Sequence, residues 1–528
     1  MPWRGYRPSV ALVGQAEKEF KFEASPGDPL PDLRPLVGGT FRHPRQLLRT
    51  AYFDSVDGRL WSLGLTLRHR TSQDDAQGTW TLKTPVKSGR SSVRNELSWM
   101  GDRGDVPPDA QRILRGVLRR EPLRQLIELE TVRERLSLRD DEDAVVAELD
   151  DDLVTVSGGP RDGLRFRQVE LELQHDNWSS GPVVKRLEAA GFTGGSAPKL
   201  ALAMPQPSGD AGRSHLQATS TLAELVRARL REGCDRLLDH DWRLRVAAPD
   251  FEPRDIHQAR VATRRLRSDL KSLRDLLDPV WVAHVRGDLK WLGAALGEVR
   301  DLDVLRQSLN GVPAELDRTL MGQRDAANTR VTLVLEDARY LDLLDRLHAA
   351  SELVPLAGGD AAELAREKAR DALPVIVGAN WRKLRRQVRK AGRHPDPGRL
   401  HRIRIKAKEL RYSSEFAEPF FERPARRMAK AARRLQDQLG EHHDAVAAGD
   451  WLRTLAYADD GARLPGAVAF QAGGLAADAR RRQDHFEAVW ERTWKKLRKP
   501  SHTDWFRSRA ATSRRRPPPR RSARVGPV

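Results

Sequence analysis

The chain has little of several residue types on which whole classes of protein depend. It contains one cysteine, Cys234, among 528 residues, which excludes an intrachain disulfide and a site built from several thiolates. Aromatic residues make up only 6% of the chain, and no apolar run approaches the roughly 18 residues needed to span a membrane. A glycine-rich phosphate loop is also missing, so a kinase or P-loop nucleotidase is not expected. We expect a cytoplasmic protein with no membrane partner.

Charge is abundant and unevenly placed. Charged residues make up 32% of the chain, and its formal net charge is +19. Residues 1–220 sum to zero, residues 221–500 carry +12, and residues 501–528 carry +7. A chain of this length predicts two or three domains, and the basic part favours a polyanionic partner.

The first 200 residues read mostly as β-strands. Turn signals such as Asp57-Gly58 and Asp162-Gly163 separate several runs rich in alternating or β-branched residues. The runs are Glu17–Phe22, Arg49–Phe53, Leu65–Arg70, Thr79–Lys83, Ser91–Trp99, Ile127–Leu138, Val145–Asp150 and Arg165–Leu173. Helices are expected near Pro108–Arg119 and Gly181–Ala190. About eight strands without long helices between them predict an antiparallel sheet or barrel.

The pattern becomes helical after a polar segment at residues 205–220, and the helical part contains an internal repeat. The segment 256–267 matches 400–411 as apolar-His-x-x-Arg-(Val/Ile)-x-x-(Arg/Lys)-x-Leu-Arg. Farther along, Leu296-Gly297-Glu298 matches Leu439-Gly440-Glu441, and we expect these two segments to pack helices closely. Two nearly collinear copies predict a pseudo-twofold pair of helical bundles.

Charged residues recur at every second position along several of the expected strands. Glu17, Glu19 and Lys21 share one strand face, and Phe20 and Phe22 share the other. Carboxylates at this spacing suit a hard divalent cation, and a lysine beside them suits a phosphate. The other pairs in step are Arg68 with Arg70, Thr81 with Lys83, Arg94 with Glu96, Arg133 with Arg135, Glu148 with Asp150 and Glu170 with Glu172. Faces that point outward would give a salt-bridged surface, whereas faces that point inward would give a charged tunnel.

The ordered set of these motifs resembles the CYTH family of triphosphate tunnel metalloenzymes. It includes Tyr52-Phe53-Asp54, Leu67-Arg68-His69-Arg70, Trp80-Thr81-Leu82-Lys83 and Val169-Glu170-Leu171-Glu172. The resemblance implies an eight-stranded antiparallel barrel whose tunnel holds a triphosphate and Mg²⁺ or Mn²⁺. It implies metal ligands at Glu17, Glu19, Glu148, Asp150, Glu170 and Glu172. It implies phosphate-binding residues at Arg68, Arg70, Lys83, Arg94, Arg133, Arg135 and Lys199, with Lys21 as the catalytic residue beside the scissile phosphate.

Three positions depart from the pattern of this family. Pro198 stands where a serine is usual, and Leu202 stands where an arginine is common. Ser98 replaces an acid that often follows Glu96. The departures bear on substrate affinity more than on the chemistry of hydrolysis.

The helical repeats carry two stripes of basic residues. His257, Arg260, Arg264 and Arg267 recur at spacings of three and four, and so do His401, Arg404, Lys408 and Arg411. A lone stripe would be read as a solvated helix face, but like charges on two facing repeats repel unless an anion compensates them. This part resembles the CHAD domain, which implies that all eight residues bind inorganic polyphosphate in a basic groove between the halves.

These observations predict a multidomain α+β protein with an N-terminal eight-stranded antiparallel β-barrel and a C-terminal all-α bundle with a twofold internal repeat. The expected divisions are residues 8–204 for the barrel, 205–220 for the linker, 221–507 for the bundle and 508–528 for a basic disordered tail. The expected function is metal-dependent hydrolysis of inorganic triphosphate or short polyphosphate, with polyphosphate binding by the bundle. The alternative is a non-catalytic polyphosphate scaffold. Association with polyphosphate granules is compatible with either function, and nucleic acid is expected only as a weak electrostatic contact of the tail.

Overall fold

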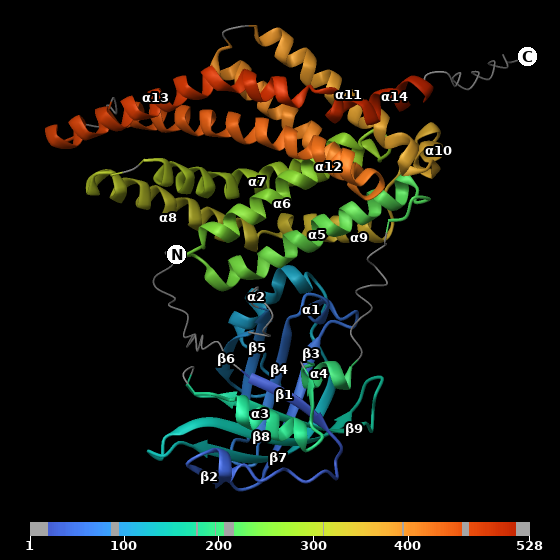
Figure 1. Cartoon of the computed structure of the whole chain (residues 1–528), viewed down its shortest axis with the longest axis vertical. Helices are drawn as coiled ribbons and strands as arrows, with labels where there is room; N and C mark the ends of the chain where they lie inside the picture. Colours follow the sequence, from blue (N-terminus) through green and yellow to red (C-terminus); the bar gives the residue numbers. More distant parts are fainter. Residues whose placement is uncertain are drawn as a thin grey trace, which may run out of the picture. The chain divides into compact units, whose positions relative to one another are not determined.

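The computed structural model describes residues 19–85, 94–175, 178–195, 197–204, 216–309, 311–392, 395–456 and 464–513. The chain divides into two compact units, Met1–Arg213 and Ser214–Val528 (Figure 1). The predictions for Glu17, for most of the linker and for the last fifteen residues of the tail lie outside the described residues. No helix in the described ranges is long and apolar enough to cross a membrane.

The first unit is built on one antiparallel sheet of ten strands. Its strands run in the order β10-β1-β9-β8-β7-β3-β4-β5-β6, and β2 pairs with β7 beside this path. Their bounds are β1 Glu19–Ala24, β2 Gly39–Arg42, β3 Gln46–Asp54, β4 Thr66–Ser72, β5 Thr79–Pro85, β6 Arg94–Met100, β7 Arg124–Arg139, β8 Val145–Ser157, β9 Arg165–Leu173 and β10 Thr193–Gly195. The predicted strands are therefore present, with β7 and β8 longer than expected.

The expectation of a closed eight-stranded barrel is wrong. The sheet has ten strands, and its path is open because β6 and β10 are not paired with each other among the described residues. The two strands that the sequence did not predict are short and rich in glycine, Gly39–Arg42 and Thr193–Gly195. Segments of three or four residues with glycine are too brief to show an alternating pattern.

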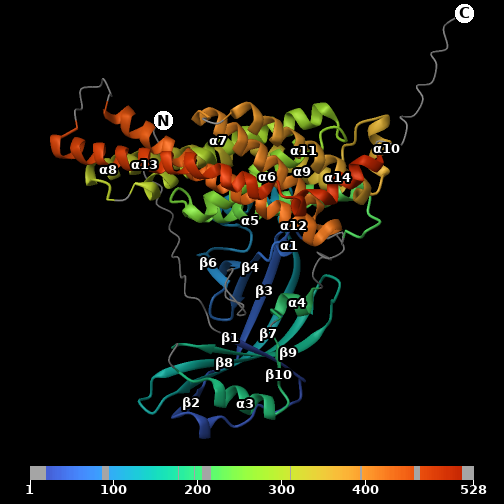
Figure 2. The same cartoon turned by 45° about the horizontal axis from the view of Figure 1, so that its top comes forward.

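Apolar side chains on one face of the sheet form its core under helices. Helix α3 (Gly181–Ala189) buries Val183 and Leu187 in a cluster with Phe22, Leu149 and Leu171. Figure 2 shows α3 at the same end of the curved sheet as β8. The other helices of this unit are α1 (Arg59–Ser62), α2 (Pro108–Leu118) and α4 (Lys199–Ala203). Burying the aliphatic side chains on this face contributes about 1.5–3 kcal/mol for each fully buried residue and leaves the opposite face for polar groups.

The second unit is built from helices in the residues that the structure describes. Its first helix, α5, has a capping box in which Thr221 and Glu224 bond each other's backbone amides. The helices are α5 Leu222–Ala247, α6 Pro253–Ser272, α7 Pro279–Ser308, α8 Ala314–Glu336, α9 Ala338–Glu352, α10 Asp360–Arg366, α11 Ala369–Ala391, α12 Pro397–Ala456, α13 Gly466–Leu497 and α14 Pro500–Ser513. In Figure 1, α12 and α13 form a layer against α6, α7 and α8.

The two sequence repeats are interrupted at equivalent places. The first copy is divided between α6 and α7, and the second runs through α12, in which two helical segments meet at a kink. Within α12, Glu422 has the non-helical backbone angles φ 33° and ψ −106°, and Pro419 and Pro424 flank it. Since proline cannot donate its backbone N–H, the pair interrupts the helix near the position where α6 and α7 separate in the first copy.

Candidate functional site

Charged residues of the first unit gather on one face of the sheet. The strand register places Glu19 beside Glu172 and Glu172 beside Glu148, so three carboxylate residues lie at one level of β1, β9 and β8. At the next level, Lys21 lies beside Glu170, Glu170 beside Asp150, and Asp150 beside Arg135. These residues lie on the opposite face from Phe20 and Phe22, as the alternation of the strands requires.

Lys21 and Lys199 meet at the buried carboxylate of Glu170. The Nζ atom of Lys21 lies 2.6 Å from Glu170 and 2.8 Å from Glu19. Lys199, from α4, lies 2.5 Å from Glu170 and 3.0 Å from Asp152. Burial would raise the pKa of Glu170, but Lys199 and Lys21 outweigh it and hold that pKa well below its usual range. Burial likewise would lower the pKa of Lys21, yet Glu170 and Glu19 raise it, so Lys21 stays charged.

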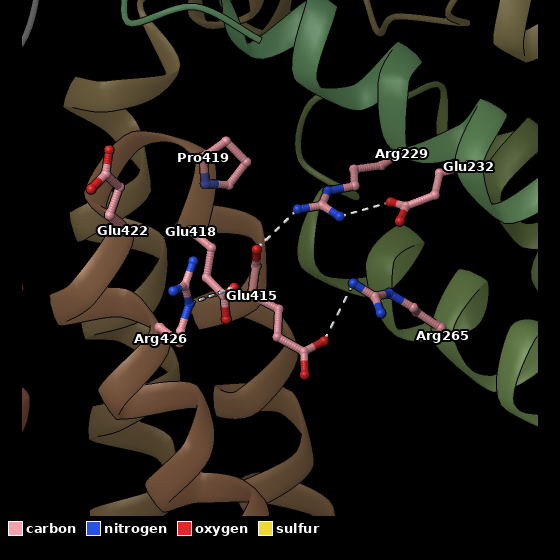
Figure 3. Close-up of a pocket in the computed structure, with 8 residues that line it drawn as sticks. All are labelled: Arg229, Glu232, Arg265, Glu415, Glu418, Pro419, Glu422 and Arg426. Atoms are coloured by element: carbon pink, nitrogen blue, oxygen red, sulfur yellow. Dashed lines mark hydrogen bonds and ion pairs between the residues drawn. The ribbon is translucent and has the colours of Figure 1, made fainter. Parts of the chain in front are cut away.

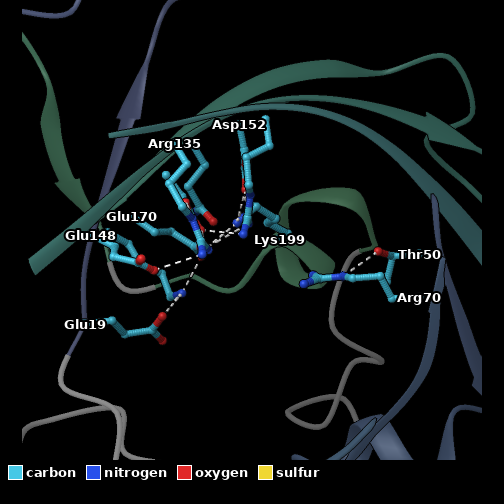
Figure 4. Close-up of polar contacts among 12 residues, drawn as sticks. Glu19, Thr50, Arg70, Arg135, Glu148, Asp152, Glu170 and Lys199 are labelled. Carbon is cyan, nitrogen blue, oxygen red and sulfur yellow. Dashed lines mark hydrogen bonds and ion pairs between the residues drawn. The ribbon is translucent and has the colours of Figure 1, made fainter. Parts of the chain in front are cut away.

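The arginines of β7 bind the acids of β8. Arg133 pairs with Asp152 at 2.7 Å and with Asp150, and Arg135 contacts Asp150 at 2.7 Å and Glu148 at 2.9 Å. The side chain of Asp152 is fully buried. Burial would raise its pKa, but Lys199 and Arg133 lower it, so the carboxylate stays ionised. Figure 4 shows these acids and bases interleaved in one network.

Basic side chains dominate the other half of the same face. Arg68, Arg70 and Lys83 lie on β4 and β5, where Glu96 is the carboxylate that pairs with Lys83 and approaches Arg68 to 3.9 Å. Arg70 donates to the hydroxyl of Thr50 at 3.2 Å and extends toward the acidic network in Figure 4. Its pKa falls to about 10, because the positive charge of Arg68 and then burial oppose its own charge. The buried Nε atom of Arg68 has no hydrogen-bond partner among the described residues.

Tyr52 links the two halves. Burial would raise the pKa of its phenol, but Arg68, Arg70, Lys83 and Lys199 together lower it. The positive charges of four side chains, from β4, β5 and α4, therefore act on the phenol of Tyr52 on β3. Such a cluster of preorganised donors suits an anion with several charges.

The predicted site residues of this unit come together on this face, with two exceptions. Glu17 lies outside the described residues, and so does the side chain of Arg94. The prediction missed Asp152, Glu96 and Thr50. The alternation Asp150-x-Asp152 could have revealed Asp152, since both residues project to the same side of β8.

The acidic level fits a hard divalent cation by its chemistry. Glu19, Glu148 and Glu172 offer carboxylate oxygens from three adjacent strands, which are the ligands that Mg²⁺ and Mn²⁺ prefer. Within the described ranges, however, no three acidic, histidine or cysteine side chains are already assembled around one point. Glu19 and Glu148 instead turn to Lys21 and Arg135.

The two basic stripes of the helical unit face each other. The pKa of Lys408 falls to about 6, because it is buried and because Arg264, Arg404, Arg267 and Arg260 oppose its charge. Burial and the two arginines of the first repeat also lower the pKa of Arg404. We call Arg260, Arg264, Arg404 and Lys408, with His257 and His401, the paired basic cluster.

Each repeat uses a glycine in the same way within this cluster. Arg260 lies over Gly297, donates to its carbonyl at 3.0 Å and pairs with Asp301 at 2.6 Å. A Cβ atom on Gly297 would lie 3.5 Å from the guanidinium carbon of Arg260, and one on Gly440 would lie 3.7 Å from Nε of Arg404. In each repeat, the glycine expected to pack helices closely therefore lies against an arginine side chain.

Histidines complete the paired basic cluster. The rings of His401 and His443 lie 4.9 Å apart, and Nδ1 of His401 is buried without a partner among the described residues. Burial and nearby arginines lower the pKa of both rings. In the first repeat, Arg300 takes the place of His443 and, after burial, lowers the pKa of His257. The prediction did not include Arg300 or His443.

The stripes are less symmetric at their far ends. Arg411 turns to Glu415 at 2.8 Å, whereas burial and Arg286 lower the pKa of Arg267.

Glu415 also borders a cavity of about 650 Å³ beside the break in α12 (Figure 3). This cavity is lined by Arg229, Glu232, Arg265, Glu415, Glu418, Pro419, Glu422 and Arg426. Most of its charges pair with each other, as the dashed lines in Figure 3 show, so it offers no excess of cations to an anion.

Comparison with known proteins identifies both units. The family model of the CYTH domain matches residues 15–196, and that of the CHAD domain matches residues 228–453. The chain is 28% identical over 492 residues to the uncharacterized proteins MT2285 and Rv2226 of Mycobacterium tuberculosis, which covers 86% of this chain and 90% of each relative.

Solved structures also match each unit separately. The CHAD domain from the plant Ricinus communis is 28% identical and covers 52% of this chain and 93% of its own, with a TM-score of 0.43. PptA from Streptomyces chartreusis is 20% identical and covers 52% and 100%, with a TM-score of 0.42. The PH1819 protein from Pyrococcus horikoshii is 17% identical and covers 35% and 97%, with a TM-score of 0.24.

Proposed function

Because this chain carries a CYTH domain followed by a CHAD domain, we propose that its sheet domain hydrolyses inorganic triphosphate or short polyphosphate and that its helical domain binds polyphosphate. One observation carries the first half of the proposal. A level of carboxylates and a group of arginines with few acids lie side by side on one buried, polar face. Acids for a metal ion and bases for a phosphate chain are the two requirements of phosphoanhydride hydrolysis.

The basic half of the face is proposed to hold the phosphate chain. Glu96 pairs with Lys83 and lies 3.9 Å from Arg68, and the positive charge of Arg68 lowers the pKa of Arg70. An oligophosphate placed between them would relieve this repulsion and supply the acceptor that Nε of Arg68 lacks. The favourable free energy of binding at the basic half of the face therefore comes from contacts that only an anion can make.

The acidic half is proposed to hold a divalent metal ion through Glu19, Glu148 and Glu172. Such an ion, when bound, would shield the phosphate charge and lower the pKa of a bound water. Lys21 remains charged between Glu19 and Glu170 and is proposed to stabilise the charge that develops on the transferred phosphoryl group. Asp150, Asp152 and Glu170 are proposed to hold Arg133, Arg135 and Lys199 in place.

The paired basic cluster is proposed to bind polyphosphate. It brings together cations of both repeats, and burial and the nearby arginines lower the pKa of Lys408. A linear polyanion would offset the repulsion among these cations. Within this cluster, the side chains of Arg260 and Arg404 lie against Gly297 and Gly440.

One observation favours a protein that binds phosphate chains without hydrolysing them. Glu19, Glu148, Asp150 and Glu170 are all engaged by lysine or arginine, and a metal ion would have to compete with those ion pairs. Turnover measurements separate this alternative from the leading proposal.

Calorimetric titration of tripolyphosphate in the presence of EDTA tests the anion site without relying on activity. The double variant Arg68→Gln/Arg70→Gln is expected to bind at least about 100-fold more weakly than the wild type, since each charged hydrogen bond contributes about 1.5–3 kcal/mol. The exposed Arg49, on the other face of the sheet, gives the control variant Arg49→Gln. Equal affinities of wild type and double variant would exclude this face as the phosphate site.

A further inference from the structure

A second basic surface lies on α11, and it is separate from the paired basic cluster. Its residues are Arg382, Lys383, Arg385, Arg386, Arg389 and Lys390, and all six are exposed. At about 100° per residue they fall within a helix sector of about 160°. We call this surface the α11 face. It contains no acidic residue, and none of its six cations has an ion pair or side-chain hydrogen bond within the described structure.

The opposite side of the same helix is fixed by packing. Trp381, Leu384 and Ala391 are buried, and the ring of Trp381 lies 5.4 Å from the ring of Trp494 on α13. The stack brings the start of the α11 face next to a second basic segment at the end of α13. That segment adds the exposed cations Arg492, Lys495, Lys496, Arg498 and Lys499. The α11 face and this segment are thus two exposed basic stretches that meet at the Trp381–Trp494 contact.

The first repeat has no such surface. Its helix α5 ends at Ala247, which the repeat aligns with Ala391 at the end of α11. At the positions equivalent to Lys383, Arg385 and Arg386, the first repeat carries Asp239, Asp241 and Trp242. The arginines that follow Trp242 are occupied by acids, since Arg243 pairs with Asp239 and Arg245 is buried against Asp241. The basic residues of the α11 face are consequently not shared by the equivalent helix of the first repeat, and the twofold arrangement of the paired basic cluster does not require them.

We propose that the α11 face, with the end of α13, is a binding surface for the phosphate backbone of double-stranded nucleic acid. The six exposed cations spread over a broad sector of the helix instead of along one line. The major groove of a duplex is about 12 Å wide and presents phosphates on both sides of an inserted helix. The proposal is independent of the function proposed for the sheet domain.

The composition of the surface disfavours a membrane. Helices that lie in a membrane interface expose a broad apolar side to the lipid, whereas Trp381 and Leu384 of α11 are buried in the protein. Helix α14 also packs on this buried side of α11, with the ring of Phe506 6.5 Å from the ring of Trp381.

Fluorescence anisotropy of the full-length protein with a labelled 20-base-pair DNA of random sequence tests the proposal. The variant Arg385→Gln/Arg386→Gln/Arg389→Gln/Lys390→Gln is expected to bind at least about 10-fold more weakly at low salt. The slope of log K against log salt should fall by about 3–4, because each phosphate contact contributes about 0.9. All four side chains are exposed, so the variant should keep the circular dichroism spectrum of the wild type.

A matched control removes the same charge elsewhere. Arg254→Gln/Arg274→Gln/Lys290→Gln/Arg318→Gln neutralises four exposed cations outside the α11 face and should retain nearly the wild-type salt slope. Equal losses in the two variants would overturn the proposal, because net charge alone would then explain binding. An equal loss of long-chain polyphosphate by the α11 variant would also overturn it. Tighter binding of the wild type to phosphatidylglycerol vesicles than to DNA would show a membrane surface instead.

Discussion

The ammonium group of Lys21 lies 2.6 Å from the carboxylate of Glu170 on the neighbouring strand, within a polar face that also carries the acids of β8. The partners are adjacent in register, and both side chains are largely buried. A buried ion pair of this kind stabilises the fold only while both charges are present. The same pair fixes the position of the cation proposed to act on the phosphate.

Replacing Arg70 should weaken substrate binding and stabilise the free protein. Arg70→Gln removes a cation whose pKa is lowered to about 10 chiefly by Arg68. We expect the KM for tripolyphosphate to rise about 10- to 100-fold. The melting temperature without ligand should rise by a few degrees, because two like charges no longer oppose each other. Steady-state kinetics and thermal denaturation measure the two effects, and a lower melting temperature would contradict the repulsion.

Loss of Glu170 should destabilise the sheet domain. Glu170→Gln leaves Lys21 and Lys199 buried beside a neutral amide, and breaking a buried pair in this way costs about 3–5 kcal/mol. Urea denaturation monitored by tryptophan fluorescence measures the change. The half-buried Glu130, which pairs with Arg49 at 3.4 Å near the surface, gives Glu130→Gln as a control with little expected effect.

Because of the carboxylate of Glu170, we also expect the protein to lose stability at acid pH. The pKa of Glu170 is depressed in the folded state, so its contribution is present above the unfolded value near 4.5 and is lost as the pH falls through the folded pKa. Unfolding free energy should decline below about pH 4.5 in the wild type and decline less steeply in Glu170→Gln. If the unfolding free energy declined identically with falling pH in the two proteins, other groups would cause the loss of stability.

Binding of polyphosphate should strengthen as the pH is lowered from 8 to 5.5. Lys408, with a pKa of about 6 between the arginines of both repeats, is mostly neutral at pH 8 and gains its charge on acidification. A bound polyanion favours the charged form, so binding should take up protons in this range. Calorimetry in buffers of different ionisation enthalpy measures the uptake. Lys408→Gln should take up less than the wild type, and an unchanged uptake would place the titration elsewhere.

The two domains should be separable by mutation. Replacing Arg260, Arg264, Arg404 and Lys408 by alanine should weaken binding of long-chain polyphosphate and leave tripolyphosphate cleavage in place, because these residues belong to the helical unit. Filter binding and phosphate release measure the two activities in one preparation. Undiminished binding of long-chain polyphosphate by this variant would show that the paired basic cluster is not the polyphosphate site.

The sequence predicts the individual strands better than it predicts whether their sheet closes into a barrel. The alternation of residues in β1, β4 and β9 places Glu19, Arg68 and Glu170 on one face, because period-two patterns survive in single strands. The open ten-stranded path could not be predicted, since Gly39–Arg42 and Thr193–Gly195 are too short to carry a pattern. Lengths are also uncertain in acidic runs, and the prediction ended β8 at Asp150 and so missed the buried Asp152.

Contacts between distant helices were predicted only in part. The repeat indicates that His257 and His401 occupy equivalent places, but it does not show that Arg264 approaches Lys408. The matching glycines were assigned to helix packing, because a sequence does not reveal that Gly297 faces an arginine rather than a helix backbone. The turn of Arg411 to Glu415 likewise depends on the side-chain geometry along α12.

Release of phosphate from tripolyphosphate, measured with Mg²⁺, with Mn²⁺ and with EDTA, tests the central claim most directly. The account predicts turnover that requires the metal and falls at least about 100-fold in Glu19→Gln, with no change in Arg49→Gln. Absence of turnover by the wild type with either metal would contradict hydrolysis. Metal-independent turnover, or full activity in Glu19→Gln, would contradict the proposed site.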